Sequence, residues 1–254
     1  MRYTYGTNNE AEARLELIAR FFNPKAAEFI DRYVEEPVEV AVDLGCGPGF
    51  TTQMLFNALG SSRVFGLDRS ADFLKMAASR LPQCTFIRHD VTETPFPVQP
   101  DLMYTRFLLS HLADAADLIR AWTGELNRGG ILLIEEIEDI TAEVGVFRRY
   151  LEIAKGLVAS EGACLYAGKS LAEAAFDGRV LCNELISFAL ADAEAASWFL
   201  PNTLTVWEKE KFVLEQTTAE ERKAISSELR DLAGSSSPRS RITWIMRRLA
   251  IVRD

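Results

Sequence analysis

Short apolar runs alternate with amphipathic stretches over the first 140 residues of the chain. Runs rich in apolar and β-branched residues predict strands over Val38–Leu44, Arg63–Asp68, Thr85–Arg88, Leu102–Thr105 and Ile131–Ile134. Between them, apolar residues at helical spacing predict helices over Thr51–Leu59, Ala71–Leu81 and Ala113–Leu126. This alternation is typical of right-handed βαβ units, in which helices cover both faces of a parallel sheet.

The two ends of the chain depart from this alternation. Residues Glu10–Tyr33 place apolar side chains at helical spacing, and Pro24 predicts a break between two helices. After about residue 140, the sequence predicts helices over Glu143–Ala159 and Glu220–Leu232, a turn over Gly234–Pro238 and a last strand over Arg241–Val252. The apolar residues of Leu185–Ala189 and Trp198–Lys211 follow no clear period.

Three alternate glycines follow the first predicted strand, in the stretch Asp43–Gly49 (DLGCGPG). Glycines between a strand and a helix let the backbone approach a ligand closely. A dinucleotide fingerprint needs GxGxxG, whereas here the third glycine falls one position early and Phe50 takes its place. A purely structural turn is the other interpretation of the loop.

Two aspartates follow the next two predicted strands. Asp68 comes about twenty residues after the glycine loop, where a carboxylate can accept hydrogen bonds from both hydroxyls of a ribose. Asp90 follows the third strand, where an acid can bind the exocyclic amine of adenine. Each aspartate alone could be a helix cap or a turn residue, but their joint placement favours a nucleoside ligand.

With this glycine loop and these two aspartates, the chain resembles the class I S-adenosylmethionine-dependent methyltransferases, most clearly over Val38–Glu138. Asp43–Gly49 resembles motif I of that family and Gly66–Ser70 resembles motif II. Further similar segments are His89–Val91, Arg106–Leu112 and Leu126–Gly130. A proline often stands in the family where this chain has Arg128, which is a minor departure.

The resemblance implies a doubly wound, Rossmann-like α/β fold with a seven-stranded, mostly parallel sheet of order 3-2-1-4-5-7-6. Strand seven would run antiparallel, with Arg241–Met246 as its candidate. It further implies one domain over residues 1–254, with an N-terminal helical lid over 1–34 and a helical substrate cap over 141–178. Within the cap, Phe147, Tyr150, Leu151 and Tyr166 are expected to form walls of the substrate pocket, although core packing is the alternative for each.

The cofactor implied by the resemblance is S-adenosyl-L-methionine. The residues expected to bind it are Tyr3, Arg14, Asp43, Gly45, Cys46, Gly47, Gly49, Asp68, Arg69, Asp90, Val91 and Arg106. Asp43 is expected to orient the cofactor's amino group directly or through water. Arg14 and Arg106 are candidates for its carboxylate, with a surface ion pair as the alternative for each.

The implied reaction moves a methyl group to an oxygen, nitrogen or carbon atom of a small molecule. His111 is the candidate general base, since an ordinary histidine titrates near neutral pH; a packed, structural histidine is the alternative. His89 is expected to face solvent. Glu135 and Glu136 point to opposite sides of their strand, so at most one of them can line the pocket. Two other functions stay open: a catalytically silent S-adenosylmethionine-binding module and, less favoured, a nicotinamide-dependent oxidoreductase.

Composition and charge limit the classes of partner that the chain is expected to bind. The formal net charge of −9 argues against a nucleic-acid partner, and the basic stretch Arg239–Arg253 is interpreted as a solvated edge strand. The four cysteines form no CxxC pair and no metal-ligand spacing is present, which favours a reduced, cytoplasmic setting. Neither a signal peptide nor an apolar run long enough to span a membrane is expected. A homodimer is left open.

Overall fold

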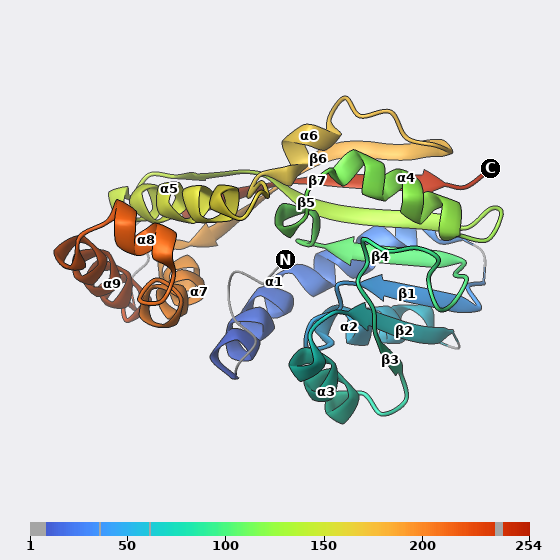
Figure 1. Ribbon diagram of the computed structural model, residues 1–254, viewed down its shortest axis with the longest axis horizontal. Coiled ribbons are helices and arrows are strands. Elements are labelled where there is room, and N and C mark those ends of the chain that lie inside the picture. Colours follow the sequence, from blue (N-terminus) through green and yellow to red (C-terminus); the bar gives the residue numbers. More distant parts are fainter. Residues whose placement is uncertain (1–8, 36, 61, 237–240) are drawn as a thin grey trace.

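The computed structural model describes residues 9–35, 37–60, 62–236 and 241–254. Its centre is a seven-stranded sheet of order β3-β2-β1-β4-β5-β7-β6, in which β7 runs antiparallel to both of its neighbours (Figure 1). The strands are β1 Val40–Leu44, β2 Arg63–Asp68, β3 Thr85–Arg88, β4 Leu102–Arg106, β5 Ile131–Ala142, β6 Arg179–Ala191 and β7 Arg241–Val252. The expected fold class and strand order are confirmed.

Two cores lie on opposite faces of this sheet. On one face, α1 (Asn9–Tyr33) and α2 (Phe50–Leu59) pack against side chains of β1, β4 and β5. On the other face, α4 (Ala115–Glu125) and α6 (Ala167–Leu171) pack against alternate residues of the same strands. A further helix, α3 (Ala71–Arg80), packs beside β2 and β3. Because both faces are covered, all five residues of β1 are buried.

The N-terminal helix corrects one prediction. Pro24 does not divide it, since α1 runs unbroken from Asn9 to Tyr33. A proline inside a helix removes one backbone hydrogen bond and strains the preceding turn. Burial on either side of Pro24, at Phe22, Ala26 and Phe29, holds the helix together despite that cost.

The last three strands extend beyond the rest of the sheet and carry two helical insertions. Between β5 and β6 lie α5 (Gly145–Ser160) and α6; between β6 and β7 lie α7 (Asp192–Thr205), α8 (Lys211–Gln216) and α9 (Ala219–Ala233). Helices α5, α7, α8 and α9 gather at one end of the sheet and share a core (Figure 1). The cap expected over residues 141–178 covers only the first insertion, and its second helix, α6, packs on the sheet instead.

The basic stretch near the C-terminus is a second correction. It forms β7, which lies between β5 and β6 and is not an edge strand. Arg248 donates from Nε to Glu135 Oε1 at 2.7 Å, and Arg247 donates from Nε to Glu138 Oε2 at 2.8 Å. Both arginines are buried, so acids from β5 neutralise them inside the sheet. Within the described residues, no helix is both long and apolar enough to cross a membrane.

Candidate functional site

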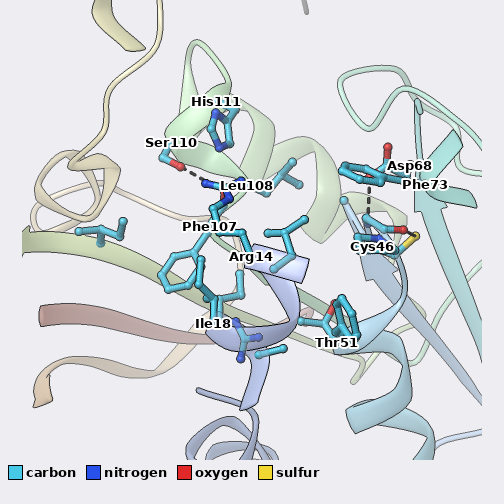
Figure 2. A pocket seen from close by; sticks show the side chains of 18 of the residues that line it. Arg14, Ile18, Cys46, Thr51, Asp68, Phe73, Phe107, Leu108, Ser110 and His111 are labelled. Carbon is cyan, nitrogen blue, oxygen red and sulfur yellow. Dashed lines mark hydrogen bonds between the residues drawn. The ribbon is translucent and has the colours of Figure 1, made fainter. Parts of the chain in front are cut away.

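The four helices α5, α7, α8 and α9 that share a core are called the cap below. A single pocket joins the carboxyl ends of β1, β2 and β4 to α5 and α7 of this cap. Figure 2 shows Cys46, Asp68 and Phe73 on one side of it, Phe107, Ser110 and His111 on the other, and Arg14 and Ile18 of α1 between them. Ten of the thirteen expected site residues line this pocket: Arg14, Gly45, Cys46, Gly47, Asp68, Arg69, Asp90, Val91, Arg106 and His111.

The glycine loop borders the pocket through Gly47. Its φ of +53° lies in the left-handed region, which favours glycine, and a side chain added there would meet only Phe73, at 4.0 Å. The space over this backbone is therefore open to a ligand. Gly49 does not line the pocket; a side chain there would meet Ala77 of α3 at 3.0 Å. Close packing of the loop on α3 thus accounts for the third glycine.

Asp68 holds the glycine loop and the following turn together. Its Oδ2 accepts a hydrogen bond from the Gly47 N–H at 2.9 Å, and its Oδ1 accepts one from the Ser70 N–H at 2.7 Å. Burial raises the pKa of Asp68, and the two backbone donors oppose that rise. A carboxylate offers about four acceptor positions, so Asp68 keeps acceptor capacity for a ribose hydroxyl beside these backbone donors.

Asp90 and Val91 form the next part of the wall. Asp90 Oδ1 accepts hydrogen bonds from the Thr92 N–H at 3.0 Å and the Thr92 Oγ1 hydroxyl at 2.8 Å. Burial raises the pKa of Asp90, but the two hydrogen bonds from Thr92 outweigh it, so the pKa is lowered overall. Asp90 is therefore an ionised acceptor, as binding of an adenine amine requires.

Asp43 does not line the pocket. It is 1% exposed, and its Oδ2 accepts hydrogen bonds from Thr51 Oγ1 at 2.6 Å and Thr52 Oγ1 at 2.7 Å. Burial raises its pKa to about 6, against the lowering effect of these two hydroxyls. Asp43 thereby ties the end of β1 to the first turn of α2 and fixes the loop between them. Tyr3, the remaining expected residue, lies outside the described residues.

Arg106 presents a buried donor beside the loop. Its Nη2 donates to Asn23 Oδ1 at 2.7 Å, whereas Nη1 is buried and has no hydrogen-bond partner among the described residues. A buried guanidinium nitrogen without a partner is costly, and a ligand carboxylate would satisfy it. Arg106 therefore fits the role expected for it.

His111 ends the short helix η1 (Leu109–His111) on the opposite wall. Burial, together with the positive charges of Arg14 and Arg69, lowers its pKa to about 4. The imidazole is therefore neutral at physiological pH. It can accept a proton, but as a weaker base than an ordinary histidine.

Glu136 supports this wall from behind. Its Oε1 accepts a hydrogen bond from the Leu109 N–H at 2.7 Å, and its Oε2 has no partner among the described residues. Burial raises the pKa of Glu136 to about 8, against the lowering effect of nearby backbone N–H groups. Glu136 thus anchors the first residue of η1. Neither Glu136 nor Glu135 lines the pocket.

The cap side of the pocket is mostly apolar and aromatic. Tyr150 and Leu151 line it as expected, whereas Phe147 and Tyr166 do not. Phe147 is instead fully buried in the core of the cap. His89 is half-buried at the edge of the pocket, and its Nε2 lies 2.8 Å from Glu93 O.

Comparison with known proteins shows which family and which solved structures this chain is similar to. Residues 41–130 match the family described as a methyltransferase domain. Residues 41–130 therefore carry a methyltransferase domain. The trans-aconitate 2-methyltransferase of Methylobacterium radiotolerans is 31% identical over 144 residues, which are 57% of this chain and 55% of that protein. The chain spans about half the length of the curated relatives that it matches.

Two solved structures share the fold of this chain. A putative methyltransferase from Bacillus halodurans is 17% identical over 89% of this chain and 97% of that chain, with a TM-score of 0.56. The geranyl diphosphate C-methyltransferase of Streptomyces coelicolor, solved with S-adenosyl-L-homocysteine, is 19% identical over 99% of this chain and 85% of that chain, with a TM-score of 0.52.

Sequence reasoning missed several residues of the pocket. The aromatic residues that it did not single out are Phe73, Phe107, Trp198, Phe199 and Trp244. Phe107 has a φ of 58°, which is unusual for an aromatic residue and carries strain of about 1–3 kcal/mol. Its ring contacts those of Phe22 and Trp244 at centroid distances of 5.2 and 5.9 Å. No local pattern marks a residue whose role depends on such backbone strain.

Proposed function

We propose that this chain transfers a methyl group from S-adenosylmethionine to a small molecule. The observation that carries the proposal is one continuous pocket, which runs from the glycine loop, Asp68 and Asp90 to His111 and the cap. The names of the matched relatives support the same activity.

The described residues fit the cofactor. We assign the ribose hydroxyls to Asp68, the adenine amine to Asp90 and the methionine carboxylate to the unpartnered Nη1 of Arg106. Gly47 leaves the backbone open beside them. S-adenosylmethionine supplies an activated methyl group when bound there.

The chain's own contribution is mainly positioning. Alignment of two reactants in one site contributes about 7–11 kcal/mol toward lowering a barrier. The apolar cap side would exclude water from the substrate, and the neutral imidazole of His111 would accept a proton from a hydroxyl or ammonium nucleophile. Glu136 would keep His111 in place through the Leu109 N–H.

Calorimetry followed by a transfer assay tests the proposal. We expect S-adenosylmethionine and S-adenosylhomocysteine to bind with micromolar affinity and NAD not to bind. Labelled methyl groups should then appear in components of a metabolite extract. Binding without transfer to any component would identify a silent binding module, and binding of NAD alone would identify an oxidoreductase. A cytoplasmic location and a homodimer remain predictions from the sequence.

A further inference from the structure

The cap side of the pocket is built from large apolar side chains on several elements. They are Phe107, Ile140, Leu151, Trp198, Phe199 and Trp244, which come from β4–η1, β5, α5, α7 and β7. The aromatic rings among them contact one another through Trp244. The ring centroids of Phe199 and Trp244 lie 6.4 Å apart, and the two ring planes are 26° from parallel. Such a wall favours flat apolar molecules, which gain from burial and from stacking.

Charged groups are scarce on this side. The formal charges that line the pocket within the described residues are Arg14, Asp68, Arg69, Asp90 and Arg106. Four of them lie at or just after the carboxyl ends of β2, β3 and β4 and border the proposed cofactor site. The charge of Arg14, on α1, acts on the cap side, where it lowers the pKa of Tyr150. Arg106 also lies beside this side, 5.7 Å from the Phe107 ring, but it is assigned to the carboxylate of the cofactor. A tricarboxylate would bury at least two carboxylates without counter-charges, which costs several kcal/mol for each ion.

One polar pair interrupts the apolar wall. Asn202 Nδ2 donates to Tyr150 Oη at 2.6 Å, and both residues line the pocket. The Tyr150 ring is fixed by stacking on Phe199 at 4.4 Å and on Trp207 at 5.1 Å. Since Oη accepts from Asn202, its own hydrogen remains available to an acceptor. Burial raises the pKa of Tyr150 to about 12, so the hydroxyl stays protonated and acts as a donor.

We propose that the cap side of the pocket selects a flat, largely apolar molecule carrying one oxygen acceptor, which the Tyr150 hydroxyl binds, and that it excludes polycarboxylates. This inference rests on the proposed function, because it names the substrate class of the same pocket. It separates this chain from the relatives whose names specify trans-aconitate.

Calorimetry on the full chain loaded with S-adenosylhomocysteine tests this, with 2-naphthol and trans-aconitate as probes. We expect 2-naphthol to bind at least tenfold more tightly than trans-aconitate. Tyr150→Phe removes the donor and keeps the ring, so the Kd for 2-naphthol should rise about 3–10-fold while that for S-adenosylhomocysteine stays unchanged. Tyr166→Phe is the matched control, since Tyr166 belongs to the same insertion but does not line the pocket.

Two results would overturn the inference: trans-aconitate binding as tightly as 2-naphthol, or the two Tyr→Phe variants binding 2-naphthol alike. Thermal melts of both variants show whether they fold as the parent does. If the parent chain fails to bind S-adenosylhomocysteine yet still prefers 2-naphthol, the proposed function fails and the preference for flat apolar ligands stands.

Discussion

The Gly47 N–H donates to Asp68 Oδ2 at 2.9 Å and so joins the loop after β1 to the last residue of β2. The two strands pair in parallel, with Asp43 opposite Gly66 and Leu44 opposite Leu67, so their carboxyl ends meet at one edge of the sheet. The hydrogen bond therefore sets the spacing between two groups that border the same ligand space. Changes to either residue test the cofactor half of the site.

Asp68→Ala should weaken binding of S-adenosylhomocysteine by about 10–100-fold or more. Hydrogen bonds to a charged group contribute about 1.5–3 kcal/mol each, and the substitution also releases the Gly47 N–H. Calorimetry measures the Kd. Asp72→Ala is the control, because Asp72 is exposed in the first turn of α3. Equal affinities for the two variants would make Asp68 a turn residue only.

Gly47→Val should abolish cofactor binding while the protein remains folded. The added side chain would enter the open space over the loop, and its positive φ adds strain of about 1–2 kcal/mol. Gly129→Val separates the two effects, since Gly129 also has a positive φ (+77°), no atoms near its added Cβ, and no place in the pocket. Both variants should melt at lower temperature than the parent, but only Gly47→Val should fail in calorimetry.

Six strands of the sheet and the residues that gather at their carboxyl ends were predictable because their signals are local. Thr85–Arg88 and Arg241–Val252 coincide with β3 and β7, since runs of alternating or β-branched residues bounded by turn residues identify strands directly. The glycine spacing and the two aspartates are likewise read within a few residues of each strand end. The carboxyl ends of parallel strands then bring them together.

The cap was not predictable in the same way. Strand β6 and helix α7 contain apolar residues at both buried and exposed positions, so neither shows a clean period. Trp198 of α7 and Trp244 of β7 are 46 positions apart in the chain, yet their ring centroids lie 5.8 Å apart. Arg248 looked like a solvated charge because its partner, Glu135, lies 113 residues away. Contacts between residues so far apart in the chain cannot be predicted from the local pattern of apolar and polar residues.

Arg248→Met should lower the free energy of unfolding by about 3–5 kcal/mol, because it leaves the Glu135 carboxylate buried without its counter-charge. Urea unfolding followed by circular dichroism measures the change. Arg149→Met removes an exposed partner of Glu228 and should cost less than about 1 kcal/mol. A similar small loss in both variants would show that the Arg248–Glu135 pair contributes no more than a surface ion pair.

Glu136→Gln should become more stable relative to the parent as the pH rises. The pKa of Glu136 is raised from 4.5 to about 8, so between these values the folded parent retains a proton that its unfolded chain releases. Stability of the parent is therefore lost as pH rises through that window, by about 2–4 kcal/mol between pH 5 and 8. Glutamine has no such titration. Unfolding curves at pH 5 and pH 8 check this, and a pH-independent difference between the proteins would contradict it.

His111 tests whether the chain uses a general base. As a base, it should contribute about 10²–10⁴-fold to kcat, so His111→Ala should lose that factor while the Kd for S-adenosylhomocysteine stays unchanged. Because burial lowers the pKa of His111 to about 4, the acid limb of the parent's rate profile should lie near pH 4 rather than near 6.5. That limb should vanish in the variant. The rates are measured at saturating cofactor, on an acceptor found in the transfer assay.

The same titration gives a second readout that needs no substrate. The folded pKa of His111 lies below its unfolded value of 6.5, so the unfolded chain binds a proton first as the pH falls. Its contribution to stability is therefore present above pH 6.5 and lost as the pH falls toward 4, and His111→Ala should lack this loss.

His89→Ala is the matched control for the rate measurements, since His89 lines the cofactor half of the pocket and its removal should leave the acid limb of kcat in place. A loss of kcat below tenfold in His111→Ala, with an unchanged profile, would assign His111 a packing role and leave catalysis to positioning alone.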